Sequence, residues 1–126
     1  MKKLSTLVKA AAVIVGVIAI TAGQANAQSD DNNDRRVIIE NLSTQEIMHL
    51  YWSNVDDGVW HEDRLGDDVI ESGDTVTADI DDDNGYCMYD LKAVLYDGTV
   101  FTRYDVNVCA VAGWDIFNRH NRLITL

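Results

Sequence analysis

From Arg36 onward the chain consists of short stretches in which apolar and polar residues alternate, separated by clusters of Gly, Asn and Asp. Alternation with a period of two is typical of half-buried strands, and no stretch of about ten or more residues has the 3.6-residue period of a helix. The sequence therefore predicts an all-β fold, namely a small antiparallel β-sandwich or partly closed barrel of about six to seven strands. The expected strands are Arg36–Asn41, Glu46–Trp52, Val59–Leu65, Thr75–Ile80, Met88–Tyr96, Thr99–Val108 and Asp115–Leu126.

The N-terminus has the organisation of a secretory signal. Three lysines form a basic start, Ala10–Ile20 is an apolar run, and Ala25–Ala27 supplies the small residues of a cleavage site. The apolar run is too short to span a bilayer, which needs about 20 residues. Residues 1–27 are thus predicted to be a signal peptide, 28–35 a disordered acidic leader, and 36–126 a single β-domain. We expect the mature protein in the periplasm or outside the cell, with no membrane insertion after cleavage.

The chain is strongly acidic. Its 10 Lys and Arg face 21 Asp and Glu, a formal net charge of −11 with His neutral. Loss of the three signal-peptide lysines would leave seven basic residues and a charge of about −14. Nucleic acid and anionic lipid are not expected as partners, because binding to phosphate depends on Lys and Arg. Cationic partners and metal ions are compatible with this charge, and a soluble monomer is expected.

Asp97-Gly98 lies between two alternating stretches and predicts a two-residue type I′ hairpin turn, which needs positive φ at both positions. In the resulting register Tyr96 is opposite Thr99, and Cys87 is opposite Val108. The predicted core face of this hairpin consists of Tyr89, Leu91, Ala93, Leu95, Val100, Tyr104, Val106 and Val108.

Cys87 and Cys109 are the two cysteines of the chain. An even number in an exported protein is most simply explained by one disulfide, which across a separation of about 22 residues would stabilise the fold by about 3 kcal/mol. The predicted register places Cys109 one residue beyond the position opposite Cys87. We therefore expect a β-bulge between Tyr104 and Cys109, or a bend near Gly85. The alternative is a pair of free thiols in a reactive site.

Several short motifs along the chain together form a recognisable pattern. They are Asn41-Leu42-Ser43, Ile47, Leu50-Tyr51, Ser53, Trp60, Leu65-Gly66, Ile70, Gly73, Cys87-Met88-Tyr89-Asp90-Leu91, Val94, Asp97-Gly98 and Asn107-Val108-Cys109. In this pattern the chain resembles a family of small exported alphaproteobacterial β-domains of unknown function, over about residues 37–113. The resemblance implies a compact β-domain with paired cysteines, export to the periplasm or beyond, and no catalytic residue. The segment Trp114–Leu126 departs from the family's commoner pattern.

A run of acidic residues precedes the first cysteine and indicates a candidate metal site. Asp79, Asp81, Asp82 and Asp83 lie within seven positions that end at Gly85. An EF-hand loop would need Gly where Asn84 stands, and helices where strands are expected, so calcium would have to bind in a hairpin loop. The alternative is a solvated turn in which the Asp side chains accept hydrogen bonds from their own backbone.

His61 lies among acidic residues, with Glu62 and Asp63 after it and Asp67 and Asp68 further on. It could ligate zinc, but zinc sites need three or four converging ligands, often His or Cys. The motif H-E-x-x-H is broken by Leu65. An exposed polar loop is the alternative.

Catalysis has little support in the sequence. The chain has no G-x-S-x-G motif, and His49, His61 and His120 are far apart along it. A small hydrolase with a carboxylate pair remains an alternative, since so many acids make some suitable pair inevitable. We expect no enzyme, and no cofactor unless the aspartate run binds calcium.

Tyr51, Trp52 and Trp60 form the remaining candidate site. Alternation places Trp52 on one face of its strand with Met48 and Leu50, and Tyr51 on the other face with Ile47 and His49. At least one aromatic residue should therefore be buried, and one exposed. An exposed ring would suit a sugar, a peptide or a protein surface. The sequence thus predicts an exported, non-catalytic binding or interaction module whose partner is an unknown protein or glycan.

Overall fold

The structure is a computed structural model that describes residues 31–126. The predicted signal peptide, residues 1–27, and residues 28–30 of the predicted leader lie outside the described residues. Within residues 31–126 no helix has the length and apolar character needed to cross a membrane.

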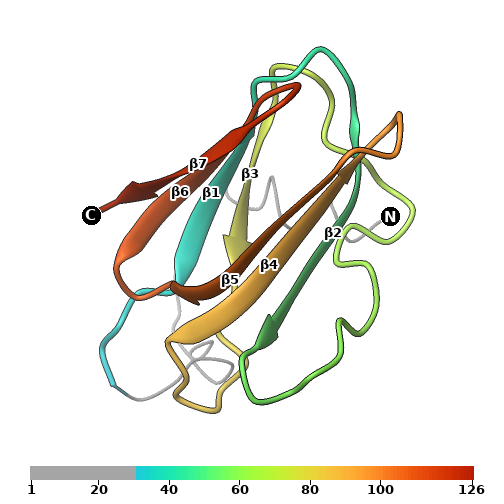
Figure 1. The fold of residues 1–126 in the computed structure, drawn as a ribbon. Helices are drawn as coiled ribbons and strands as arrows, with labels where there is room; N and C mark the ends of the chain where they lie inside the picture. The colour runs from blue at the N-terminus through green and yellow to red at the C-terminus, as the bar shows by residue number, and fades with distance from the viewer. Residues whose placement is uncertain (1–30) are drawn as a thin grey trace.

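Residues 31–126 form seven strands in two sheets, which face each other as the two layers of a sandwich (Figure 1). The all-β prediction, with a sandwich of about six to seven strands, is confirmed. One sheet has the order β3-β1-β6-β7 and the other has the order β2-β4-β5. The strands are β1 (Arg36–Asn41), β2 (Ile47–Asn54), β3 (Thr75–Asp79), β4 (Met88–Leu95), β5 (Val100–Asn107), β6 (Val111–Ile116) and β7 (Asn121–Thr125). Four of the strand pairings are antiparallel, but β1 and β6 run parallel.

The prediction of a strand at Val59–Leu65 is wrong. No strand lies between β2 and β3, and residues 55–74 form a long connection that follows the free edge of β2 (Figure 1). The Arg64 amide donates to the Leu50 carbonyl (2.7 Å), and Ile47 and Ile70 exchange two backbone hydrogen bonds (2.9 and 3.0 Å). The connection thereby covers an edge that would otherwise offer unpaired backbone groups to another chain.

The prediction of a single strand at Asp115–Leu126 is also wrong. This segment contains the end of β6, a tight turn in which the Phe117 amide donates to the His120 carbonyl (2.9 Å), and β7. The β6–β7 hairpin brings Trp114 into the core, where it is fully buried and donates its indole N–H to Asn121 (2.8 Å).

The core lies between the two sheets. β4 supplies the face predicted for it, because Tyr89, Leu91, Ala93 and Leu95 are all at most 2 % exposed. The prediction for β5 is wrong at two positions, since Val100 and Tyr104 point outward and are 53 % and 67 % exposed. The buried residues of the core are Val37, Ile39, Ile47, Leu50, Trp52, Leu65, Ile70, Val76, Ala78, Ile80, Tyr89, Leu91, Ala93, Leu95, Phe101, Val106, Val108, Val111, Trp114 and Ile116.

The β4–β5 hairpin differs from the predicted two-residue turn. Its loop has three residues, because the Leu95 amide donates to the Thr99 carbonyl (2.9 Å) and the Gly98 amide donates back to Leu95 (2.9 Å). Only Gly98 in this loop adopts positive φ (92°), whereas a type I′ turn would need it at Asp97 as well. The register near the turn is therefore one residue away from the predicted one, with Val94 opposite Val100.

A β-bulge in β5 restores the predicted register further along the hairpin. Tyr104 and Asp105 together lie opposite Asp90, and Asp105 has the positive φ (56°) that such a bulge can require. Beyond the bulge Tyr89 pairs with Val106, as predicted. The extra residue explains why Tyr104 points outward while Val106 and Val108 point into the core.

A second bulge lies in β2 at Met48, between the pairs Ile47–Leu95 and His49–Val94. It changes the phase of the strand, so Ile47 shares the core with Leu50 and Trp52. His49 and Tyr51 stay on the outer face. Simple alternation had predicted Ile47 on the same face as His49 and Tyr51, and Met48 on the same face as Leu50 and Trp52.

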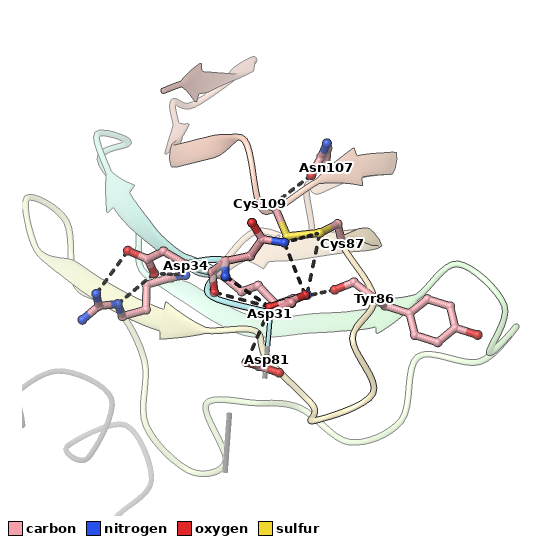
Figure 2. The surroundings of a disulfide bond; sticks show 10 residues. Asp31, Asp34, Asp81, Tyr86, Cys87, Asn107 and Cys109 are labelled. Carbon is pink, nitrogen blue, oxygen red and sulfur yellow. Dashed lines mark hydrogen bonds and ion pairs between the residues drawn. A yellow bond between two sulfur atoms is a disulfide. The ribbon is translucent and has the colours of Figure 1, made fainter. Parts of the chain in front are cut away.

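The disulfide between Cys87 and Cys109 is confirmed, with a Cα–Cα distance of 5.4 Å (Figure 2). A bulge between Tyr104 and Cys109 is also confirmed, but it does not bring the two cysteines opposite each other. The Val108 amide still donates to the Cys87 carbonyl (2.8 Å). Cys109 reaches its partner because the chain turns after β5, where the Asn107 side chain accepts a hydrogen bond from the Cys109 amide (3.0 Å).

Candidate functional site

The outer face of the three-stranded sheet carries a group of aromatic and polar side chains. Strand pairing places Tyr51 of β2 beside Lys92 of β4, and Ser53 of β2 beside Asp90 of β4. Tyr104, exposed by the β5 bulge, lies across from Asp90. Because the core residues of these strands alternate with them, these side chains share the face that points away from the other sheet.

Trp60 extends from the long connection over this face and contacts the rings of two strands. Its ring centroid is 6.4 Å from that of Tyr51 and 6.4 Å from that of Tyr104. His49 continues the series, 6.3 Å from Tyr51. We call His49, Tyr51, Trp60 and Tyr104 the aromatic row. Tyr51 and Trp60 are half-buried, and partial burial raises the pKa of the Tyr51 phenol.

Lys92 lies against the aromatic row as a cation without a carboxylate partner. Its ammonium nitrogen is 4.7 Å from the centre of the Tyr51 ring and 4.9 Å from that of Trp60. Within residues 31–126 no Asp or Glu oxygen lies within ion-pair distance of it. The ring faces, which carry partial negative charge, therefore provide its electrostatic partner.

A pocket of about 290 Å³ opens between the connection and the sheet. We call it the groove; it is lined by Ser53, Gly58, Val59, Trp60, Asp90 and Tyr104. One oxygen of Asp90 accepts a hydrogen bond from the Asp105 amide (3.0 Å). The groove thus combines two aromatic rings with one carboxylate and the hydroxyl groups of Ser53 and Tyr104.

Hydrogen bonds hold the connection in place over the sheet. The Asp63 carboxylate accepts the amides of Leu50 (3.0 Å) and Leu65 (2.9 Å), and its other oxygen is 2.7 Å from the His49 ring. The Tyr86 hydroxyl donates to Asp56 (2.9 Å), and this bond raises the pKa of Tyr86. These hydrogen bonds fix the segment that forms the wall of the groove.

Trp52, the third aromatic residue of the predicted site, lies on the opposite face of β2. It is 6 % exposed and belongs to the core, with the Arg64 guanidinium 4.7 Å from its ring centre. The structure thus brings Tyr51 and Trp60 together and separates Trp52 from them.

The aspartate run is arranged as a series of local turns. The Asp79 carboxylate accepts a bond from the Asp81 amide (3.3 Å), Asp81 from Asp83 (2.9 Å), and Asp82 from Asn84 (3.1 Å). Asp81 also lies 3.7 Å from the Arg35 guanidinium, and its side chain is only 6 % exposed. Across residues 31–126 no group of three or more His, Cys, Asp or Glu side chains has the arrangement of a metal site.

His61 has a local partner as well. Its ring nitrogen is 2.6 Å from Asp57, which comes four residues earlier. Residues 56–61 therefore form a closed turn within the connection, and this turn includes Gly58 and Val59 of the groove.

Arg35 forms a second polar cluster with Asp31 and Tyr86, which lie next to the disulfide (Figure 2). Its side chain is fully buried, and it donates to the Tyr86 carbonyl (2.6 Å) and to the Asp31 carboxylate (2.6 and 3.0 Å). It also approaches the Cys87 sulfur (3.7 Å). These bonds hold the pKa of Asp31 far below its usual range. The described end of the predicted leader, residues 31–35, is thus bound to the domain at Arg35.

The residues of the site that were missed in the sequence include Asp90, Lys92 and Tyr104. Tyr104 was placed in the core because the assumed two-residue turn put it opposite Leu91, whereas the three-residue loop puts Arg103 there. Asp90 and Lys92 alternate with the buried residues of β4, so their outward orientation was available in the sequence, but their proximity to Trp60 was not.

A scan against protein-family models, a search of curated proteins and a search of solved structures found no match. The family resemblance described above therefore stays a prediction.

Proposed function

We propose that the protein is a non-catalytic binding module that recognises a segment of a partner protein through the groove and the aromatic row. The observation that carries the proposal is the pairing of the half-buried Trp60 with the exposed Tyr104 in the lining of one pocket. Aromatic side chains with polar groups beside them are enriched at the centre of protein interfaces.

The geometry favours side-chain recognition over the binding of a large ligand. A volume of about 290 Å³ lies at the lower end of the range for small-molecule sites, which is about 300–1,000 Å³. A single long side chain of a partner would fit within it. The neighbouring rings of the aromatic row would then contact the residues on either side of that side chain.

The disulfide supports an oxidising compartment as the place of action. This agrees with the predicted export of the chain. In such a compartment the strongly negative charge keeps nucleic acid away and attracts cationic proteins.

The proposal is tested by selecting short peptides from a displayed library on purified, oxidised residues 28–126. The chain offers a matched pair of tyrosines for the control. Tyr104 lies in the groove and is 67 % exposed, whereas Tyr96 lies at the β4–β5 turn and is 71 % exposed. We expect Tyr104→Ala to weaken peptide binding by about tenfold or more, because truncating a central aromatic residue costs over 1 kcal/mol, and Tyr96→Ala to leave it unchanged.

Two results would contradict this function. Peptides that bind equally well to both variants do not use the groove. Neutral oligosaccharides that bind in a Tyr104-dependent way, in the absence of any selected peptide, would mean that the module recognises glycans.

A further inference from the structure

We propose that the groove is a subsite for a basic side chain of the partner, with arginine preferred, and that Asp90 is its counter-ion. This inference rests on the proposed function and specifies the chemistry of the segment that is bound. It follows from the rings, the carboxylate and the charge of the surrounding surface.

The two rings of the groove provide a place for a planar cation. The Trp60 and Tyr104 centroids are 6.4 Å apart, and the ring planes differ by 38°. A guanidinium group stacks on aromatic faces and is more weakly hydrated than an ammonium group, so it loses less on leaving water. These rings therefore favour arginine over lysine.

Asp90 provides a negative charge at the wall of the same pocket. One of its oxygens is held by the Asp105 amide, which orients the carboxylate. Its other oxygen accepts no hydrogen bond from any residue in the range 31–126, and Asp90 forms no ion pair there. A guanidinium in the groove would supply the missing donor, and a charge-assisted bond of this kind is stronger than a neutral one.

Lys92 shows that this aromatic surface already holds a cation. The Trp60 ring lies within 4.9 Å of the Lys92 ammonium, yet Lys92 is not among the residues that line the groove. The lysine thus occupies the Tyr51 side of Trp60, and the groove lies on the Tyr104 side. An arginine in the groove would share Trp60 with Lys92 and would be repelled by it.

The charge of the whole domain supports the same choice of ligand. The chain carries 21 acids against 10 basic residues, and Asp56, Asp57 and Asp105 lie on segments next to the groove. Such a field attracts a cationic segment from a distance and repels an anionic one, and salt weakens the effect.

The test uses two blocked pentapeptides that differ at one central position, arginine in one and citrulline in the other. Citrulline has nearly the same shape as arginine but no charge. Binding to residues 28–126 is followed by NMR at the Trp60 indole and the Tyr104 amide. We expect the arginine peptide to bind about tenfold more tightly than the citrulline peptide, and a higher salt concentration to reduce this preference.

Two variants separate charge from folding. Asp90→Asn keeps an oxygen for the Asp105 amide and should abolish the preference for arginine. Lys92→Met keeps an unbranched side chain against the rings and removes the competing charge, so it should increase the affinity for the arginine peptide about two- to threefold. Melting temperatures close to that of the unmodified protein would show that both variants are folded.

The outcomes distinguish the subsite from the function on which it rests. Equal binding of the two peptides at Trp60 would overturn the arginine subsite and leave the peptide-binding module standing, as would an arginine preference that survives in Asp90→Asn. If neither peptide and no neutral oligosaccharide changes the Trp60 signal, both proposals are wrong. If only an oligosaccharide does so, the groove binds glycans, and both proposals are again wrong.

Discussion

Arg35 and Arg36 are neighbours in the sequence, but their side chains lie in different surroundings and have different roles. The Arg35 side chain is fully buried, whereas the Arg36 side chain is 61 % exposed and pairs with the equally exposed Asp34. Composition alone placed Arg35 in a disordered leader. The alternation did indicate a buried position for Arg35, since it shares a face with Val37 and Ile39. Burial was not predicted, because a charged residue is not expected at a buried position without a partner. The carboxylate partners of Arg35 are Asp31, four positions earlier, and Asp81, which is far away in the sequence and could not be identified from it.

Replacement of each arginine by methionine should separate the two roles. Arg35→Met removes the pair with Asp31, the positive charge 3.7 Å from Asp81 and the bond to the Tyr86 carbonyl, so we expect a loss of about 3 kcal/mol in the free energy of unfolding. Arg36→Met disrupts an exposed pair and should change it by less than about 0.5 kcal/mol. Urea denaturation of residues 28–126 measures both. Similar values for the two variants would show that the Arg35 cluster does not stabilise the fold.

At the scale of single strands, the two β-bulges mark the limit of prediction from alternation. The existence of β1, β2, β3, β4 and β5 followed from the period of two, because each has one buried face. The alternation did not correctly predict which residues of β2 and β5 face the core along their whole length, because one inserted residue moves every residue beyond it to the other face. The strand expected at Val59–Leu65 failed for a different reason. Its apolar residues have separate surroundings, since Leu65 is buried in the core, Trp60 belongs to the aromatic row and Val59 is exposed, which local alternation cannot reveal.

The bulge in β5 depends on a residue that tolerates the left-handed backbone region. Asp105 has φ of 56°, which Asp and Asn adopt far more readily than β-branched residues. Asp105→Val should therefore reduce the free energy of unfolding by about 1–2 kcal/mol, and Asp105→Asn, which removes the charge but keeps this tolerance, should have little effect. Denaturant titrations measure the difference. A valine variant as stable as the asparagine variant would show that the bulge relaxes at no cost.

At the scale of the whole molecule, the candidate site joins segments that are distant in the sequence. Tyr51 and Trp60 could be recognised as neighbours because only a short turn separates them. Asp90, Lys92 and Tyr104 come from the hairpin on the other side of the disulfide, and only the pairing β2-β4-β5 places them beside the first two. The sequence therefore predicted the fold class, the disulfide and part of the aromatic surface, while the pocket required the structure.

The disulfide stabilises this arrangement where the hairpin opens. It joins the residue before β4 to the turn after β5, at a sequence separation of 22. We expect Cys87→Ser combined with Cys109→Ser to lower the free energy of unfolding by about 3 kcal/mol, because the reduced chain has more conformational freedom when unfolded. Urea titrations of the variant and of the oxidised protein give this value. The same loss should appear when the unmodified protein is titrated with a reductant present, and a difference of less than about 1 kcal/mol would contradict the expectation.

The parallel pairing of β1 with β6 has a consequence for the order in which the chain can fold. β1 lies between β3 and β6, so one of its two edges stays open until residues 111–116 have been synthesised. While the β6–β7 hairpin is still being translated, the four-stranded sheet cannot close. The sheet therefore closes through pairs such as Ile38 with Gly113, which lie far apart in the sequence, and non-local contacts of this kind form slowly.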